Sequence, residues 1–216
     1  DPTYFGLVTK DKTGIKSIAD LKGKRIAYAF TSTITRDLLE TEAEAYGLNP
    51  AKDITIIKVE DSVTGLRDLD QGRVDAVSCS LGGSKMAEFA TKMKLVLLPF
   101  EADKIHIMKK RLPAIMSAVT PSNLSGVDPG VPVVYTPMLF IGRADLSDAL
   151  VYKMVKTVME NYDDLKVVNP VMAGWKPEVA VRELTVPYHP GAIKYYKEKG
   201  FWSAKMDQLQ KKLLEK

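Results

Sequence analysis

The chain has 216 residues, 45% of them hydrophobic, which is enough to bury the core of one large domain or two small ones. Its formal charge of +4 is carried by the stretch 194–216, where seven Lys face three acidic residues, so the rest of the chain is neutral and nucleic-acid binding is not expected. One cysteine and two histidines exclude an internal disulfide and offer no familiar metal-ligand spacing, and no apolar run reaches the length of a membrane span. The chain starts at Asp1 without a recognisable signal segment, which predicts either a mature form or an expressed fragment, in both cases with any export signal already removed.

The first strongly patterned segment is a short apolar strand, 25–30, followed by three hydroxyl residues that open an amphipathic helix ending at Gly47. These residues are Thr31, Ser32 and Thr33. Hydroxyl groups beside the unpaired backbone N–H groups of a helix start form a favourable anion site. Simple capping of the helix explains the same residues equally well.

Arg36 follows within the first turn or so of this helix, where a positive charge opposes the helix dipole. Two explanations fit the residue. It can hold a carboxylate or phosphate with two parallel hydrogen bonds, or it can form a surface ion pair with Glu40 one turn later.

The middle of the chain alternates strands and helices, which predicts a parallel sheet. Strands are expected at 53–59, 74–77 and 95–98, and helices at 62–69, around 86–93 and around 104–112. Ligands bind at the carboxyl edge of such sheets, so Ser80 and Gly82, in the second strand-to-helix turn, are candidate ligand-binding residues. Turn geometry alone is the alternative explanation for both.

A turn-rich stretch, 113–132, is expected to be a domain boundary or a loop over a cleft. Beyond it, 133–141 is strand-like, with Pro137 indicating an edge or a bend, and Tyr135 is a candidate either for ligand binding or for the core. Helices are predicted at 147–162, capped by Asp145 or Ser147, from Pro190 to Gly200, and in the lysine-rich tail, whose apolar side carries Met206, Leu209 and Leu213.

Four motifs resemble a known family over nearly the whole chain. IKSIADLKGK at 15–24 and LDQGRVDAV at 69–77 resemble the middle domain of type II periplasmic solute-binding proteins. RADLSDALVYKMVKTVMENYDDL at 143–165 and VPYHPGAIKYYKEKGFW at 186–202 are narrower, and are similar to the TAXI-type receptors of TRAP transporters.

The resemblance implies an α/β fold of the type II periplasmic-binding-protein kind, with a parallel-rich sheet and flanking helices. By analogy, residues 1–15 are the hinge strand and its lead-in, 16–132 form a complete second lobe, and 133–216 contain the returning strand and the C-terminal helical part of lobe one. The N-terminal part of lobe one is then missing, and a one-sided cleft is expected to bind weakly.

The resemblance also implies a function. It predicts a periplasmic binding subunit without enzymatic activity, cofactor or metal, which captures a small organic anion such as an amino acid (for example glutamate) or a dicarboxylate and presents it to the TRAP membrane permease. The expected ligand-binding residues are Thr31, Ser32, Thr33, Arg36, Ser80, Gly82 and Tyr135.

Two other functions use the same architecture. A ligand-sensing module of a receptor or regulator is expected to carry a helix-turn-helix or a membrane anchor, and neither is recognisable in these residues. A transferase with a pyrrole cofactor on Cys79 would need a lining of arginines for its polyacidic substrate, whereas the arginines here are few, and an apolar, buried position is the commoner environment of a lone cysteine.

Overall fold

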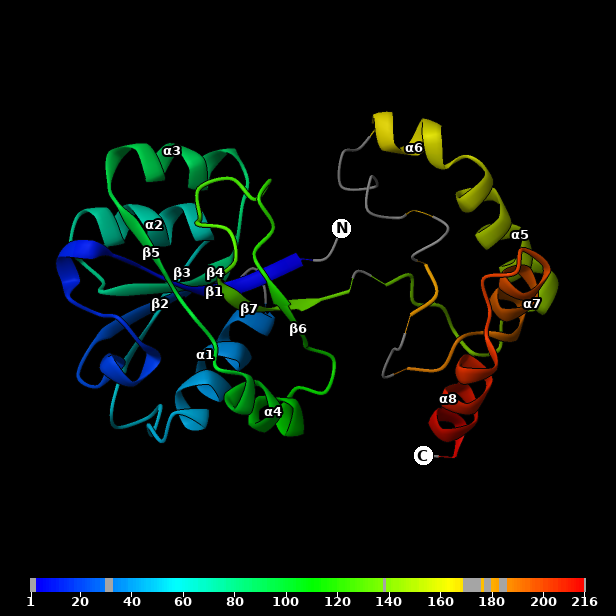
Figure 1. Cartoon of the computed structure of the whole chain (residues 1–216), viewed down its shortest axis with the longest axis horizontal. Coiled ribbons are helices and arrows are strands. Elements are labelled where there is room, and N and C mark those ends of the chain that lie inside the picture. The colour runs from blue at the N-terminus through cyan, green and yellow to red at the C-terminus, as the bar shows by residue number, and fades with distance from the viewer. Residues whose placement is uncertain are drawn as a thin grey trace. The chain divides into compact units, whose positions relative to one another are not determined.

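The computed structural model (Figure 1) describes residues 3–29, 33–137, 139–168, 176, 180–182 and 186–215. The chain forms two compact units. The first, Thr3–Pro137, is called the sheet unit, and the second, whose described part lies within 139–215, is called the helical unit.

The sheet unit alternates strands and helices, as the sequence predicts. Its strands are β1 (Thr3–Lys10), β2 (Arg25–Ala29), β3 (Thr55–Val59), β4 (Ala76–Ser80), β5 (Leu95–Leu98), β6 (Met116–Val119) and β7 (Pro132–Thr136). Its helices are α1 (Thr33–Ala45), α2 (Ser62–Asp70), α3 (Ser84–Lys92) and α4 (Ala102–Arg111), with short 3₁₀ segments at Asp11–Thr13 and Ile18–Leu21.

These strands form one sheet in the order β3-β2-β4-β1-β7-β6, and β5 also pairs with β1. Strand β2 is parallel to β3 and β4, whereas β1 is antiparallel to β4, β5 and β7, and β6 is antiparallel to β7. Among the described strands, β2, β3, β4, β5 and β7 therefore run one way, and only β1 and β6 run the other. The predicted α/β class with a mainly parallel sheet is confirmed.

The core lies on both faces of the sheet because neighbouring residues of each strand point to opposite sides. Leu7, Ile26 and Leu98 are fully buried against α1 and α4, whereas Val8 and Val77 are fully buried on the side of α2 and α3. Figure 1 shows these helix pairs on the two sides of the sheet. Coverage of both faces explains why the strands are almost continuously apolar.

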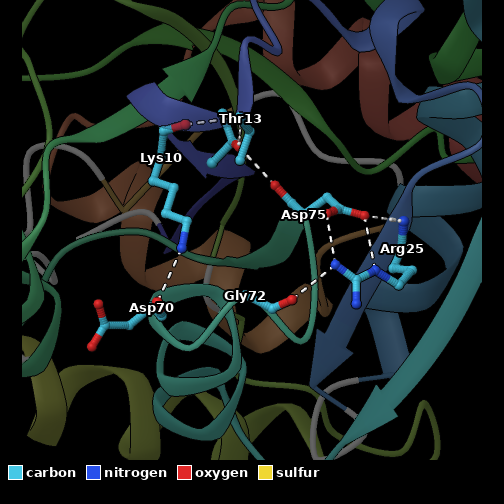
Figure 2. A network of polar contacts seen from close by, with 7 residues as sticks. Lys10, Thr13, Arg25, Asp70, Gly72 and Asp75 are labelled. Carbon is cyan, nitrogen blue, oxygen red and sulfur yellow. Dashed lines mark hydrogen bonds and ion pairs between the residues drawn. The ribbon is translucent and has the colours of Figure 1, made fainter.

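A polar cluster ties the strands together where β2 and β4 begin and β1 ends (Figure 2). The Arg25 side chain donates to both carboxylate oxygens of Asp75 at 3.1 and 2.9 Å, its backbone N–H donates to Asp75 at 2.8 Å, and its guanidinium also reaches the carbonyl of Gly72 at 2.9 Å. Lys10 donates to the carbonyl of Asp70 at 3.0 Å. This part of the motif 69–77 is therefore a structural clamp at the sheet edge opposite the one where β2, β3 and β4 end.

The turn-rich stretch differs from the prediction because it contains β6, which pairs with β7. The loop after β6 is held by Thr120, whose hydroxyl donates to the carbonyl of Asp128 at 2.6 Å and accepts from the N–H of Val131 at 2.9 Å. It also lies directly on α3: a Cβ at Gly126 would come within 2.7 Å of the Met86 backbone carbon. The loop is thus a packed part of the sheet unit.

The strand predicted at 133–141 is too long, because β7 ends at Thr136 and Phe140 and Ile141 are 72% and 83% exposed. Pro137 has no N–H to continue the ladder, which accounts for the end of the strand. Sequence reasoning also failed to separate α6 (Tyr162–Val168) from α5 (Asp148–Glu160).

The helical unit explains the motif VPYHPG. His189 caps α7 (Pro190–Glu198) by accepting from the N–H of Gly191 at 3.2 Å, and its other ring nitrogen lies 3.1 Å from the carbonyl oxygen of Leu146. Pro190 occupies the first helical turn, as predicted. A Cβ at Gly191 would lie 2.3 Å from the carbonyl oxygen of Asp148, so only glycine allows α5 and α7 to pack this closely.

The rest of this unit is an aromatic core closed by α8 (Ala204–Leu214). The ring of Tyr188 packs edge-on against Trp202 and Tyr196, with centroids 5.2 and 6.1 Å apart. The side chain of Gln210 on α8 holds both the N–H and the carbonyl of Tyr188 at 2.8 Å, and Met206 is buried, as predicted for the apolar side of this helix. Ser147 is the cap of α5, which settles the choice between it and Asp145.

Candidate functional site

The candidate site is the sheet edge at which β2, β3, β4 and β7 end and β1 begins. The register places Phe5 opposite Ser80 and Tyr4 opposite Tyr135, so the ends of three neighbouring strands meet there. Helices α1, α2 and α3 each start close to the end of the preceding strand at this edge. The strand order thus brings the described candidates, from the segments that contain Arg36, Ser80 and Tyr135, to one edge.

Most of the predicted hydroxyl cluster falls outside the described residues. Thr31 and Ser32 are outside them, and Thr33 is the first residue of α1, with only its backbone described. The helix therefore begins within the predicted cluster and continues to Ala45, with Gly47 in the left-handed region at φ 78°. The anion-binding role of these three residues remains a prediction.

Arg36 makes the surface ion pair that was one of its two predicted roles. Its Nε donates to Oε1 of Glu40 at 2.9 Å, and this hydrogen bond is the main cause of the raised pKa of Arg36 and the lowered pKa of Glu40. The guanidinium carbon also lies 5.8 Å from the ring centre of Tyr28, near the end of β2. Hydrogen bonding to Tyr28 also contributes to the raised pKa of Arg36. Within the described part of the chain, its two terminal nitrogens form no ion pair, which leaves room there for a carboxylate ligand.

Ser80 is an exposed residue at the end of β4, and its hydroxyl has no partner among the described residues. By strand alternation it points to the α1 side, as does Ser78, whose hydroxyl donates to the carbonyl of Thr35 at 3.2 Å. Ser78 stands opposite Tyr28, the residue under Arg36. Ser80 and Arg36 therefore lie on the same side of the sheet edge.

The protein's own side chains fill the space around Gly82 and accept a hydrogen bond from its backbone N–H. Its φ of 88° requires glycine, a Cβ there would lie 2.5 Å from a methyl carbon of Leu124, and its N–H donates to the sulfur of Met86 at 3.3 Å. These contacts support the alternative explanation, turn geometry. Ligand binding by Gly82 stays a prediction.

The next residue, Gly83, is the more open one and was not singled out from the sequence. It is the N-cap of α3 at φ 90°, it supplies no side-chain cap, and nothing lies within 4 Å of the position of a Cβ. The start of α2 is different, because the carboxylate of Asp61 accepts from the N–H of Thr64 at 2.7 Å. The carboxylate of Asp61 thus caps the N-terminus of α2, whereas the N-terminus of α3 has no side-chain cap.

Tyr135 lies at the same edge, on β7, beside a residue that sequence reasoning missed. Its ring centre is 6.0 Å from that of Tyr4 on β1, and both side chains are half-buried. Tyr4 carries no sequence signal of its own, because its neighbour becomes known only from the pairing of β1 with β7.

Two ionisable groups lie in the interior away from this edge. Cys79 is fully buried, and burial raises the pKa of its thiol to about 12. Glu42 on α1 is also fully buried, neither of its carboxylate oxygens has a hydrogen-bond partner in the described part of the chain, and burial raises its pKa to about 8. A thiol so far from its reactive thiolate form is unsuited to carrying a covalent cofactor.

Two other kinds of feature are absent from the described residues. They contain no group of three or more His, Cys, Asp or Glu side chains placed to hold a metal ion. Among the described helices, none combines the length and the apolar composition that crossing a bilayer requires. An open depression lined by Glu44, Gly47, Leu48, Asn49 and Pro50 follows the end of α1 and is separate from the candidate site.

Comparison with solved structures finds similarity to periplasmic binding proteins. The periplasmic aliphatic sulphonate-binding protein SsuA of Escherichia coli is 15% identical over 97% of this chain and 58% of its own, with a TM-score of 0.44. The putative sulfonate-binding protein SsuA of Methylobacillus flagellatus KT is 23% identical over 44% of this chain and 27% of its own, with a TM-score of 0.38. Substrate-binding domain 2 of Lactococcus lactis GlnP is 16% identical over 62% of this chain and 44% of its own, with a TM-score of 0.35.

The chain therefore spans between 27% and 58% of the length of these three structures. A family model described as the NMT1-like family matches residues 1–200, which is most of the 216 residues. The chain belongs to the NMT1-like family.

Proposed function

We propose that this chain is part of a periplasmic solute-binding subunit of a TRAP transporter of the TAXI type, and that it captures a small organic anion such as an amino acid or a dicarboxylate. The observation that carries the proposal is the chemistry of one sheet edge. There, α3 begins without a side-chain cap, Ser80 exposes a free hydroxyl, and Arg36 has terminal nitrogens that form no ion pair among the described residues.

Each of these groups suits an anion. Backbone N–H groups at a helix start and hydroxyls donate hydrogen bonds, and a guanidinium binds a carboxylate with two parallel bonds. Thr31, Ser32 and Thr33 add hydroxyls at the start of α1 in this proposal. The role is binding without chemistry: the buried thiol of Cys79 argues against the transferase alternative.

A direct test is an NMR titration of the ¹⁵N-labelled chain with glutamate, succinate and glutarate up to millimolar concentrations. Amide shifts at Ser80, Gly83 and the first turn of α1 support the proposal. Replacing Arg36 by Ala should weaken binding about tenfold, because a charge-assisted hydrogen bond is lost.

Arg73→Ala is the matched control, since Arg73 forms a similar exposed ion pair with Asp68 at 2.8 Å but precedes β4, at the other sheet edge. It should leave the affinity unchanged. Anions that shift no amide at this edge, or an Arg36→Ala variant that binds as tightly as the wild type, would contradict the proposed site. Binding of the TRAP membrane subunits to the receptor, measured with and without the anion, separates transport from a sensory role.

A further inference from the structure

Two tyrosines stand side by side at the candidate edge. Tyr4 and Tyr135 face each other across β1 and β7, with their rings tilted by 55° and their centres 6.0 Å apart. Both are half-buried, and neither phenol hydroxyl has a hydrogen-bond partner within the described ranges. Hydroxyls of buried tyrosines usually find a partner, so these two ring ends are left to solvent or to a ligand.

The pair lies on the same side of the sheet as α3. Tyr4 packs against the core cluster that contains Met86 of α3 and Val133 of β7, and strand alternation puts Tyr135 on the side of Val133. On its other side Tyr135 pairs with Met116, and the carbonyl of Tyr4 accepts from the N–H of Leu81 at 2.8 Å. Met116, Tyr135, Tyr4 and Leu81 thus follow one another across neighbouring strands, from β6 to the turn before α3.

The spacing fits a single small molecule. Leu81, in the turn before α3, is hydrogen-bonded to the backbone of Tyr4, and Tyr135 lies one strand further on, about 4.8 Å away along the sheet. An aromatic acid has about this length between its charged group and the far side of its ring.

We infer that Tyr4 and Tyr135 form an aromatic wall that makes the site selective for anions with a planar aromatic or heteroaromatic body. This rests on the proposed function, because the charged end is bound at the uncapped start of α3, which lies on the same side of the sheet as the two rings. A pair that only stabilises the sheet would affect stability and leave ligand preference unchanged.

The test compares two acids of similar size, phenylacetate and cyclohexylacetate, with glutarate as the reference anion. Dissociation constants come from NMR titration of the full 216-residue chain, read at the amides of Ser80 and Gly83. We expect the wild type to prefer phenylacetate roughly twofold to tenfold, the range of aromatic contacts in proteins. Tyr4→Leu and Tyr135→Leu should remove this preference and leave glutarate binding unchanged, whereas Tyr4→Phe should keep it.

Equal affinities of the wild type for the two acids would overturn the inference, as would a preference that survives in both Leu variants. If the Leu variants fail to fold, the wild-type comparison alone decides. Glutarate binding without aromatic preference refutes only this inference. Failure of all three anions to bind at this edge refutes the proposed function, and the inference with it.

Discussion

The buried carboxyl group of Glu42 gives a prediction about stability. Glu42 is 0% exposed on α1, neither oxygen has a partner among the described residues, and burial raises its pKa from the ordinary 4.5 to about 8. The ionisable groups coupled to it are Tyr46 on the same helix and Cys79 on β4, and both are neutral in the same pH range because burial raises the pKa of each. Glu42 is therefore protonated in the folded protein at neutral pH.

Because the folded pKa is the higher one, the folded chain holds a proton that the unfolded chain releases between pH 4.5 and about 8. The contribution of Glu42 to the free energy of unfolding is thus largest below pH 4.5 and is lost as the pH rises to about 8. A difference of one pKa unit between the folded and unfolded chain corresponds to ~1.4 kcal/mol, so the stabilisation lost over this pH range is at most on the order of 5 kcal/mol.

Replacing Glu42 by Met removes the titrating group and keeps a similar length. We expect the free energy of unfolding of the variant to exceed that of the wild type by about 1–3 kcal/mol at pH 5, because an unsatisfied neutral group is removed. At pH 8 the excess should be several kcal/mol larger. Urea unfolding followed by circular dichroism at pH 5, 6, 7 and 8 measures this difference. Asp37→Asn, which removes an acidic group from an exposed site on the same helix, is the control variant.

A difference between Glu42→Met and the wild type that stays constant from pH 5 to 8 would refute the reasoning. It would mean that the carboxyl group has a partner or reaches water in the folded chain.

Three further predictions concern the scaffold. Asp75→Asn should cost about 1–3 kcal/mol in urea unfolding at pH 7. The cost should be smaller at pH 3, because the hydrogen bond from Arg25 holds the pKa of Asp75 below its usual 3.8 in the folded chain, so the unfolded chain binds a proton there that the folded chain resists; an equal cost at both pH values would contradict this. Gly191→Ala should force α7 away from the Asp148 carbonyl and lower the stability of the helical unit by about 1–3 kcal/mol. Unfolding followed by tryptophan fluorescence measures this loss, because both tryptophans lie beyond residue 137. Gly126→Ala should destabilise the sheet unit by a similar amount, because φ is 83° and the added methyl group meets the backbone of α3. It should also speed amide hydrogen exchange in the first turn of α3, and unchanged exchange would show that the loop is not packed there.

Local patterning was enough to predict most elements of this protein. Period-two and period-3.6 apolar spacing, with Gly47, Pro190 and Gly200 as boundaries, predicted the main helices and most strands to within a few residues. These features are local, because capping, proline geometry and side-chain alternation depend on residues a few positions apart. The same reasoning missed β6, whose strand conformation depends on pairing with the distant β7.

The candidate site was only partly predictable for the same reason. Arg36 and Ser80 follow from strand-to-helix turns, but their placement on one side of an edge depends on the pairing of β2 with β4. Tyr4 had no local signal at all.

The sequence by itself determined the fold class and the family motifs, because these depend on residue order and periodicity. Only the tertiary structure decided which groups are left free. It showed that Asp61 already caps α2, that Leu124 covers Gly82, and that Glu42 and Cys79 are buried. Hydrogen-bond satisfaction and burial depend on atoms that are distant in sequence, and a linear pattern does not contain those distances.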